Sequence, residues 1–332
     1  MKKLASILLF GVLSMFFAEV CSGASTLWFV NFWGLFVTMP LYLGHALFFF
    51  NCAVRFKRTS VRQLYFFGMM FGLYEALITK VLWFGYPGST ASMFGTIGGV
   101  AWGEFLSVVL FWHPVMSFLV PIFVYELLSR DILPGHEKIL QKNWRTILGV
   151  VLLVVIAANL QNNGASYNLL VSFGSVAGAL LIIFILNWLT KTKTLQSLTL
   201  GNTGMILLSV YLIILYASTT ILILPERLPQ TILPYLLILL WYLVVLGLLW
   251  IDSPTNKLTA KKKNLFSTRD LFVFAILLAV VTVVFALFSQ ISQFLLVFFA
   301  LVIVILGGVF LLASLLSLLR QKLKENALNS SL

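Results

Sequence analysis

Long apolar runs, separated by short polar stretches, follow one another along the whole chain. Bounded by charged residues, Pro, Gly and Asn, they predict ten segments, at 4–20, 28–54, 62–84, 104–128, 145–161, 166–189, 203–224, 231–251, 270–288 and 292–319. Most of them approach or exceed the roughly 20 residues that a helix needs to cross a bilayer. The runs are continuous and do not alternate at every second residue, which excludes a β-barrel. The pattern predicts an all-α polytopic integral membrane bundle of about ten transmembrane helices.

Composition supports the membrane prediction and narrows the partners. The 332 residues are 61% hydrophobic and 10% charged. A formal net charge of +12 is also typical of nucleic-acid binding. Here, however, the basic residues lie in short loops between apolar segments and form no basic face interleaved with aromatic residues. We therefore expect the lipid bilayer as a partner and no nucleic acid.

The basic residues also orient the chain. If ten segments cross the membrane, all but two of the 22 Lys and Arg residues lie on one face. These are Lys2, Lys3, Arg55, Lys57, Arg58, Arg62, Arg130, Lys138, Lys142, Arg145, Lys191, Lys193, Lys257, Lys261, Lys262, Lys263, Arg269, Arg320, Lys322 and Lys324. The exceptions are Lys80 and Arg227. Positive charge accumulates on the cytoplasmic side of membrane proteins, so this face and both termini are predicted to be cytoplasmic.

Residues 1–24 permit a second interpretation. Lys2 and Lys3, a short apolar core and the small residues 22–24 have the order of a cleavable secretory signal peptide. Cleavage would leave nine spans with the remaining topology unchanged. Retention as the first transmembrane helix is the preferred alternative.

Ionisable residues concentrate in the first part of the chain. The first four segments contain Glu19, His45, Glu75, Lys80, Glu104, His113 and Glu126, whereas later segments contain almost none away from their ends. No loop is long enough for a soluble domain. We therefore expect residues 1–130 to carry a polar intramembrane site, and residues 131–332 to form a hydrophobic six-helix part of the same membrane domain.

Two of these residues reach the same depth. Glu75 precedes the predicted outer end of its segment at Phe84 by about 14 Å of helix, and His113 follows Glu104, where the next segment begins, by about 14 Å. Both therefore approach the midplane of a hydrocarbon core about 30 Å thick. A bare carboxylate there costs at least a few kcal/mol, so Glu75 must be protonated, paired or beside water. The simpler alternative is a protonated Glu75 that only links two helices.

The neighbouring polar residues are expected to occupy different levels. Lys80 is rotated by about 140° from Glu75 on a continuous helix, so it is expected to extend outward, toward Glu104. Glu19 lies at the outer end of the first segment and His45 toward the inner end of the second, where either could be interfacial.

The fourth segment has unusual backbone chemistry. Pro114 and Pro121 release the carbonyls of Leu110 and Ser117, which predicts a locally broken helix beside His113. Ser117 follows His113 by four residues and shares its face. The preceding stretch, GYPGSTASMFGTIGGVAWGE, has a GxxxGxxxG spacing at residues 95, 99 and 103. It predicts a close helix contact, a re-entrant turn or a plain outer loop that covers the site.

Three strings carry a resemblance to a known family. AEVCSG at 18–23, GLYEALITK at 72–80 and HPVMSFLVPIFVYELL at 113–128 resemble a family of uncharacterised prokaryotic multi-pass membrane proteins, over residues 15–130. The resemblance implies the same fold, a prokaryotic cell membrane and an N-terminal site, but no activity. There is a more distant likeness to CAAX-type intramembrane proteases, which have a Glu pair and two histidine motifs. Here the pair is reduced to Tyr74 and Glu75.

Three classes of function remain open. The first is a transporter or permease-like protein, whose midplane site takes a cation, a proton or a small polar solute. The second is an intramembrane hydrolase or lipid-modifying enzyme that uses Glu75 and His113. The third is a non-catalytic protein that binds a partner or lipid. No metal site is predicted, because a third ligand would have to come from another depth. The candidate catalytic residues are Glu75 and His113, and the candidate substrate-binding residues are Lys80, Glu104, Ser117, His45 and Glu19.

Overall fold

The computed structural model describes residues 2–86, 89, 92–190, 193–255 and 264–329. Within these residues, nine helices are long and apolar enough to cross a bilayer, which confirms the predicted all-α polytopic membrane bundle. Of the basic loop residues named above, Lys191, Lys257, Lys261, Lys262 and Lys263 lie outside the described residues.

The first four predicted segments contain several kinds of helix. The first consists of α1 (Lys2–Met15) and the π-helix η1 (Phe16–Val20). The second consists of the 3₁₀-helix η2 (Trp28–Val30), the π-helix η3 (Gly34–Thr38) and α2 (Met39–Arg55). The third consists of α3 (Val61–Gly72), the 3₁₀-helix η4 (Leu73–Ala76) and α4 (Val81–Phe84). After the strands β1 (Thr96–Ile97) and β2 (Val100–Ala101), the fourth consists of α5 (Trp102–Glu104), the π-helix η5 (Phe105–Leu119) and α6 (Val120–Ser129).

The remaining segments are more regular. They are α7 (Glu137–Leu140), α8 (Trp144–Gly164), α9 (Leu169–Leu189), the 3₁₀-helix η6 (Leu195–Leu198), α10 (Asn202–Leu222), the 3₁₀-helix η7 (Pro225–Arg227), α11 (Leu233–Ile251), α12 (Thr268–Leu287) and α13 (Ser289–Asn329). Polar side chains fix several of the starts. Ser60, Asn143 and Ser267 each form a reciprocal capping box at the first turn of α3, α8 and α12.

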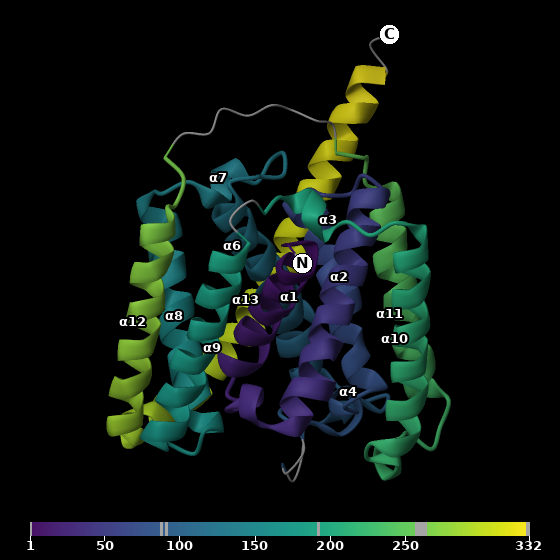
Figure 1. Cartoon of the computed structure of the whole chain (residues 1–332). Helices are drawn as coiled ribbons and strands as arrows, with labels where there is room; N and C mark the ends of the chain where they lie inside the picture. The colour runs from purple at the N-terminus through teal and green to yellow at the C-terminus, as the bar shows by residue number, and fades with distance from the viewer. Residues whose placement is uncertain (1, 87–88, 90–91, 191–192, 256–263, 330–332) are drawn as a thin grey trace.

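The early segments form the interior of the bundle. Helices α1 and α2 pack together, and α3 packs along η5, while α8, α9 and α12 lie on one side and α10 and α11 on the other (Figure 1). In the most apolar 18-residue stretch of each of the three long early spans, 61%, 56% and 78% of the residues are buried, against at most 28% in the later spans. The later helices therefore present apolar side chains outward, as expected for contact with lipid.

The described basic loops meet at one end of the bundle, here called the basic face. Lys3 donates to the carbonyl of Thr199, Arg55 to that of Leu200, and Arg58 to that of Trp250. The other end, here called the opposite face, contains the turns 21–27, 164–168 and 223–232 and the hairpin of β1 and β2. There, for example, Arg227 donates to the carbonyl of Gly85.

The third segment still runs from the basic face to the opposite face, but the prediction of one continuous helix over 62–84 is wrong (Figure 1). The helix α3 ends at Gly72, a 3₁₀ turn follows, and Lys80 has left-handed backbone angles with φ of 61°. Close packing between α3 and η5 determines where the third segment is interrupted. A Cβ at Gly68 would lie 2.5 Å from Pro114 Cα, and one at Gly72 would lie 3.1 Å from His113 Cβ. The two glycines let α3 approach η5 closely.

The fourth segment was predicted to be a locally broken helix, but its helix is continuous. The backbone continues through Pro114 as the π-helix η5 and then into α6. Neighbouring hydroxyls satisfy the two carbonyls that the prolines release. Tyr65 donates to Leu110 O at 2.7 Å, and Ser14 donates to Ser117 O at 2.7 Å. Such rescue from adjacent segments allows Pro inside a membrane helix.

The described residues of the glycine-rich stretch do not form the predicted close contact between two helices, although a Cβ at Gly99 would lie 2.4 Å from Pro234 Cγ in α11. Strands β1 and β2 form an antiparallel hairpin with Gly98 and Gly99 between them, at φ of 62° and 76°. Positive φ at both central residues is typical of a type I′ turn, which favours Gly. The plain-loop alternative is closest to this outcome, and Gly103 lies in the next helix, α5.

Candidate functional site

The two residues predicted at equal depth are in direct contact. Glu75 Oε1 lies 2.8 Å from His113 Nε2, and His113 Nδ1 lies 2.9 Å from Ser117 Oγ. The hydroxyl of Thr79 donates to the second oxygen of Glu75. Glu75 is 8% exposed, whereas His113 and Ser117 are essentially inaccessible. Glu75 and His113 can thus share a proton inside the bundle, and Ser117 can donate to the ring or accept from it.

The break in the third segment positions this contact. Glu75 lies in the 3₁₀ turn just after Gly72, so its side chain leaves the axis of α3 where α3 and η5 are closest. His113 projects from the π-helix η5, and Ser117 follows on the same face. A carboxylate and an imidazole that are both buried stabilise each other only at hydrogen-bond distance. Here that distance is present.

Two tyrosines extend the site toward the opposite face. Tyr42 donates to Glu19 Oε1 at 2.5 Å, and the Tyr42 and Tyr74 hydroxyls lie 2.9 Å apart. Ser25 donates to the other oxygen of Glu19 at 2.5 Å. The ring of Tyr74 meets the ring of His113 edge-on, with 4.9 Å between centroids. Glu19 is therefore linked to the neighbourhood of His113 through two hydroxyls.

His45 is buried beside the same tyrosine, and its expected interfacial position is wrong. Only 1% of His45 is exposed, and its ring packs against Tyr74 and Phe71 at 5.1 and 5.2 Å between centroids. Its Nδ1 lies 2.8 Å from the carbonyl of Leu41, and its Nε2 lies 3.3 Å from the Tyr216 hydroxyl. His45 joins the aromatic surroundings of His113 without contacting Glu75 itself.

Lys80 does not extend outward to Glu104, which corrects the prediction. The residue is completely buried, and its ammonium donates to the carbonyls of Thr219 at 2.8 Å and Ile78 at 3.3 Å, and also to that of Ile223. The prediction assumed a continuous helix, whereas the left-handed backbone at Lys80 redirects the side chain. Since α10 ends at Leu222, Lys80 caps the C-terminus of α10, where a positive charge is favourable.

Glu104 lies apart from the pair, under the turn that precedes the hairpin. One carboxylate oxygen accepts from the Met93 amide at 2.9 Å, and the other is buried without a partner among the described residues. A Cβ at Gly85 would lie 2.8 Å from the first oxygen. Of the predicted site residues, Glu75, His113 and Ser117 are thus in contact, Glu19 and His45 adjoin them through tyrosines, and Lys80 and Glu104 do not join them.

A second buried acid–histidine pair lies near the basic face and was not predicted. His136 Nδ1 lies 3.0 and 2.9 Å from the two oxygens of Glu126, and its Nε2 lies 2.9 Å from the carbonyl of Thr59. Both side chains are completely buried. The pair fixes the loop that leads to α7 against the end of α6. The sequence signal was weak, because His136 lies in a polar connection where a solvated histidine is the usual outcome.

Tyr42, Tyr74 and Thr79 are further site residues that sequence reasoning did not assign. The available signal was the spacing of Gly68 and Gly72, which marks the closest approach of α3 to another helix and directly precedes Glu75. In the described part of the chain, no three His, Cys, Asp or Glu side chains are grouped as metal ligands.

Fold and site together define a class, namely a multi-pass α-helical membrane protein with an interior polar site on its early segments. Residues 8–325 match the model of an uncharacterized membrane protein family, and the chain belongs to that family. The chain is also 41% identical over 123 residues to an uncharacterized protein of Archaeoglobus fulgidus. That alignment spans 36% of this chain and 37% of the relative. No solved structure matches the chain.

Proposed function

We propose that the chain is a transporter or permease-like protein whose residues 1–130 carry a midplane site at Glu75 and His113. One observation carries the proposal: a carboxylate on an interrupted helix lies 2.8 Å from a histidine inside the bundle. Secondary transporters commonly bind substrates and coupling ions near the midplane, where helices are discontinuous. Interrupted backbone at this depth is tolerated where protein encloses it or where it lines a cavity.

The surrounding groups favour a proton or a small cation as the coupled species. Glu19 and Glu75 supply two carboxylates, and Tyr42 and Tyr74 supply hydroxyls that both donate and accept. Ser25 and Glu19 are partly exposed at the opposite face. In this proposal, Glu75 changes its protonation or pairing during transport, His113 holds the alternative proton, and the tyrosines connect the site to Glu19. His45 and Ser117 complete its walls, Lys80 and Glu104 flank it, and residues 131–332 enclose it.

The test is charge movement in proteoliposomes on a solid-supported membrane after a step in external pH. We expect a transient current in the unmodified protein that falls at least tenfold in Glu75→Gln. Glu226→Gln removes an exposed carboxylate from the opposite face and is the matched control. It should keep the current. Equal currents in the unmodified protein and Glu75→Gln would refute a coupling role for this carboxylate.

A hydrolase is the second candidate, because Ser117, His113 and Glu75 form one hydrogen-bonded series. Nucleophile, base and orienting acid occur in this order in serine hydrolases. In the serine proteases the nucleophile contacts Nε2 and the acid Nδ1, whereas here the two nitrogens are exchanged. Labelling of membranes with a fluorophosphonate distinguishes this candidate. Labelling that disappears in Ser117→Ala would support it, and an unlabelled native protein would argue against it.

A further inference from the structure

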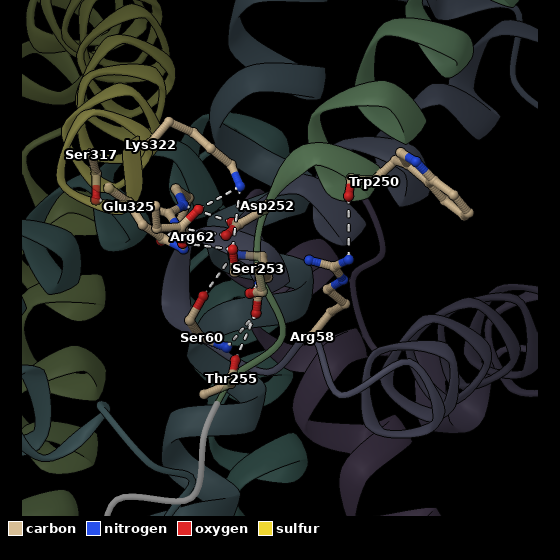
Figure 2. A network of polar contacts seen from close by, with 12 residues as sticks. Arg58, Ser60, Arg62, Trp250, Asp252, Ser253, Thr255, Ser317, Lys322 and Glu325 are labelled. Atoms are coloured by element: carbon tan, nitrogen blue, oxygen red, sulfur yellow. Dashed lines mark hydrogen bonds and ion pairs between the residues drawn. The ribbon is translucent and has the colours of Figure 1, made fainter. Parts of the chain in front are cut away.

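A network of polar contacts joins three distant segments at the basic face (Figure 2). The first turn of α3, the end of α11 and the last turns of α13 meet there. Arg62 donates to both oxygens of Asp252 at 2.8 and 2.7 Å, to Ser317 Oγ at 2.8 Å and to Gln321 Oε1 at 2.5 Å. Arg62 therefore fixes α13 against the bundle, and its own charge is balanced by Asp252.

A second ion pair belongs to the same network of polar contacts. Lys322 donates to Glu325 Oε2 at 2.7 Å, and Glu325 Oε1 accepts from Ser253 at 2.7 Å and from Gln321 at 2.8 Å. The charges of Arg62 and Lys322 are thus both matched by carboxylates. These groups hold the geometry in place, and they leave no cation of their own for a ligand.

An open pocket of about 640 Å³ lies against this network. It is lined by Arg62, Ala313, Leu316, Ser317, Arg320, Gln321, Lys324 and Glu325. Within the described residues, Arg320 and Lys324 have no hydrogen-bond or ion-pair partner, and both are exposed. They are four residues apart on α13, so they lie on one face and repel each other. The Glu325 carboxylate faces the same pocket, but it is already paired.

The position of the pocket relative to the membrane identifies the ligand class. With 41 residues, α13 is about 60 Å long, roughly twice the thickness of the hydrocarbon core. Its end projects beyond the bundle at the basic face (Figure 1). The apolar residues Ala313 and Leu316 line the pocket on the side of the membrane, and Arg320 and Lys324, which have no partner among the described residues, lie one to three turns beyond them. Cations above an apolar, lipid-facing surface match a phosphate headgroup and its acyl chains.

We propose that this pocket binds the phosphate of an acidic glycerophospholipid in the leaflet at the basic face, with Arg320 and Lys324 as donors. The acyl chains lie along Ala313 and Leu316. A free phosphate would use the same two cations but would gain nothing from the apolar side of the pocket. The proposal is independent of the Glu75 site, which lies in the interior of the bundle.

The test is native mass spectrometry of the delipidated full-length protein with phosphatidylglycerol or phosphatidylcholine of identical acyl chains. We expect preferential retention of phosphatidylglycerol, and about tenfold or greater weakening of that retention in the double variant Arg320→Gln, Lys324→Gln. The matched control is Lys138→Gln, Arg145→Gln, which removes two exposed basic residues from the same face and leaves the same net charge.

Three results would contradict the proposed lipid site. Equal retention of the two lipids would overturn the proposal, and so would equal loss in the test and control variants, because surface charge alone would then explain binding. If inorganic phosphate competes at concentrations similar to those of the lipid, the ligand of the pocket is a free phosphate anion and the lipid proposal is overturned. Because Arg320 and Lys324 form no hydrogen bond or ion pair with the described residues, unchanged thermal unfolding of the double variant is expected and verifies that it is folded.

Discussion

The close approach of α3 to η5 predicts that a single methyl group at Gly68 disturbs both stability and the polar site. In Gly68→Ala, the new Cβ would lie 2.5 Å from Pro114 Cα and 2.9 Å from Pro114 Cβ. Carbon atoms in contact prefer about 3.5–4.0 Å, so the two segments must separate by about 1 Å. Since the obstacle is backbone, a side-chain rotation cannot relieve it.

The size of the effect follows from two opposing contributions. Overpacking of a close contact costs about 1–3 kcal/mol. Replacing Gly by Ala inside a helix stabilises it by about 1 kcal/mol. Gly247→Ala in α11 is the matched control, because a Cβ there meets nothing within 4 Å. Both variants share the helix contribution, so the difference between their free energies of unfolding isolates the clash and should be about 1–3 kcal/mol.

The assay is thermal and denaturant unfolding of the purified protein in detergent, with the Glu75 carboxyl infrared band as a second readout. The band is assigned by its absence in Glu75→Gln. A separation of about 1 Å would lengthen the 2.8 Å Glu75–His113 hydrogen bond past its limit, so the band should shift in Gly68→Ala and stay fixed in Gly247→Ala. Equal stability of the two variants, with an unshifted band in both, would refute the close approach as the determinant of the site.

Two further predictions concern other buried polar side chains. His136→Ala leaves the buried Glu126 carboxyl without its histidine hydrogen-bond partner and should lower the free energy of unfolding by about 1–3 kcal/mol, measured by denaturant unfolding; a loss near zero would contradict the burial of the pair. Lys80→Met removes the donor to the carbonyls of Thr219 and Ile223, so hydrogen exchange should increase at the end of α10 and remain unchanged at the end of α11. Unchanged exchange at both ends would contradict the capping role of Lys80.

The sequence was sufficient for nine of the ten predicted spans and for the contact between Glu75 and His113, although the depth of Glu75 was calculated on a continuous third helix that the structure interrupts after Gly72. Apolar length reports which segments can lie in hydrocarbon, and a rise of about 1.5 Å per residue placed Glu75 and His113 at a similar level even though neither segment is a regular α-helix there. It was also sufficient to name the two carbonyls released by Pro114 and Pro121. That Tyr65 and Ser14 supply the missing donors depends on neighbouring segments, which local pattern does not specify.

The errors have one physical origin. Depth along an unbroken helix predicted where Lys80 and His45 should lie, but in a membrane both lipid and protein interior are apolar. Hydrophobic pattern therefore does not distinguish a side chain that faces lipid from one enclosed by other helices. Lys80 is enclosed because two of the carbonyls that accept hydrogen bonds from it, those of Thr219 and Ile223, lie at the end of α10 and directly after it, distant in the sequence. His136 is buried because the loop before α7 folds back onto Glu126, which charge and length do not reveal.

The interrupted third segment makes the two parts of the chain depend on each other. Its non-helical residues cannot face lipid, because their backbone groups would lose hydrogen bonds. They are enclosed instead, and Lys80 ties them to the end of α10. Thr79, the residue before Lys80, donates to the Glu75 carboxylate. A shift of α10 would therefore be transmitted through two consecutive residues to the acid of the central pair. The later helices, whose described interior residues include no Asp, Glu, His, Lys or Arg, thus influence the geometry of a site built on residues 1–130.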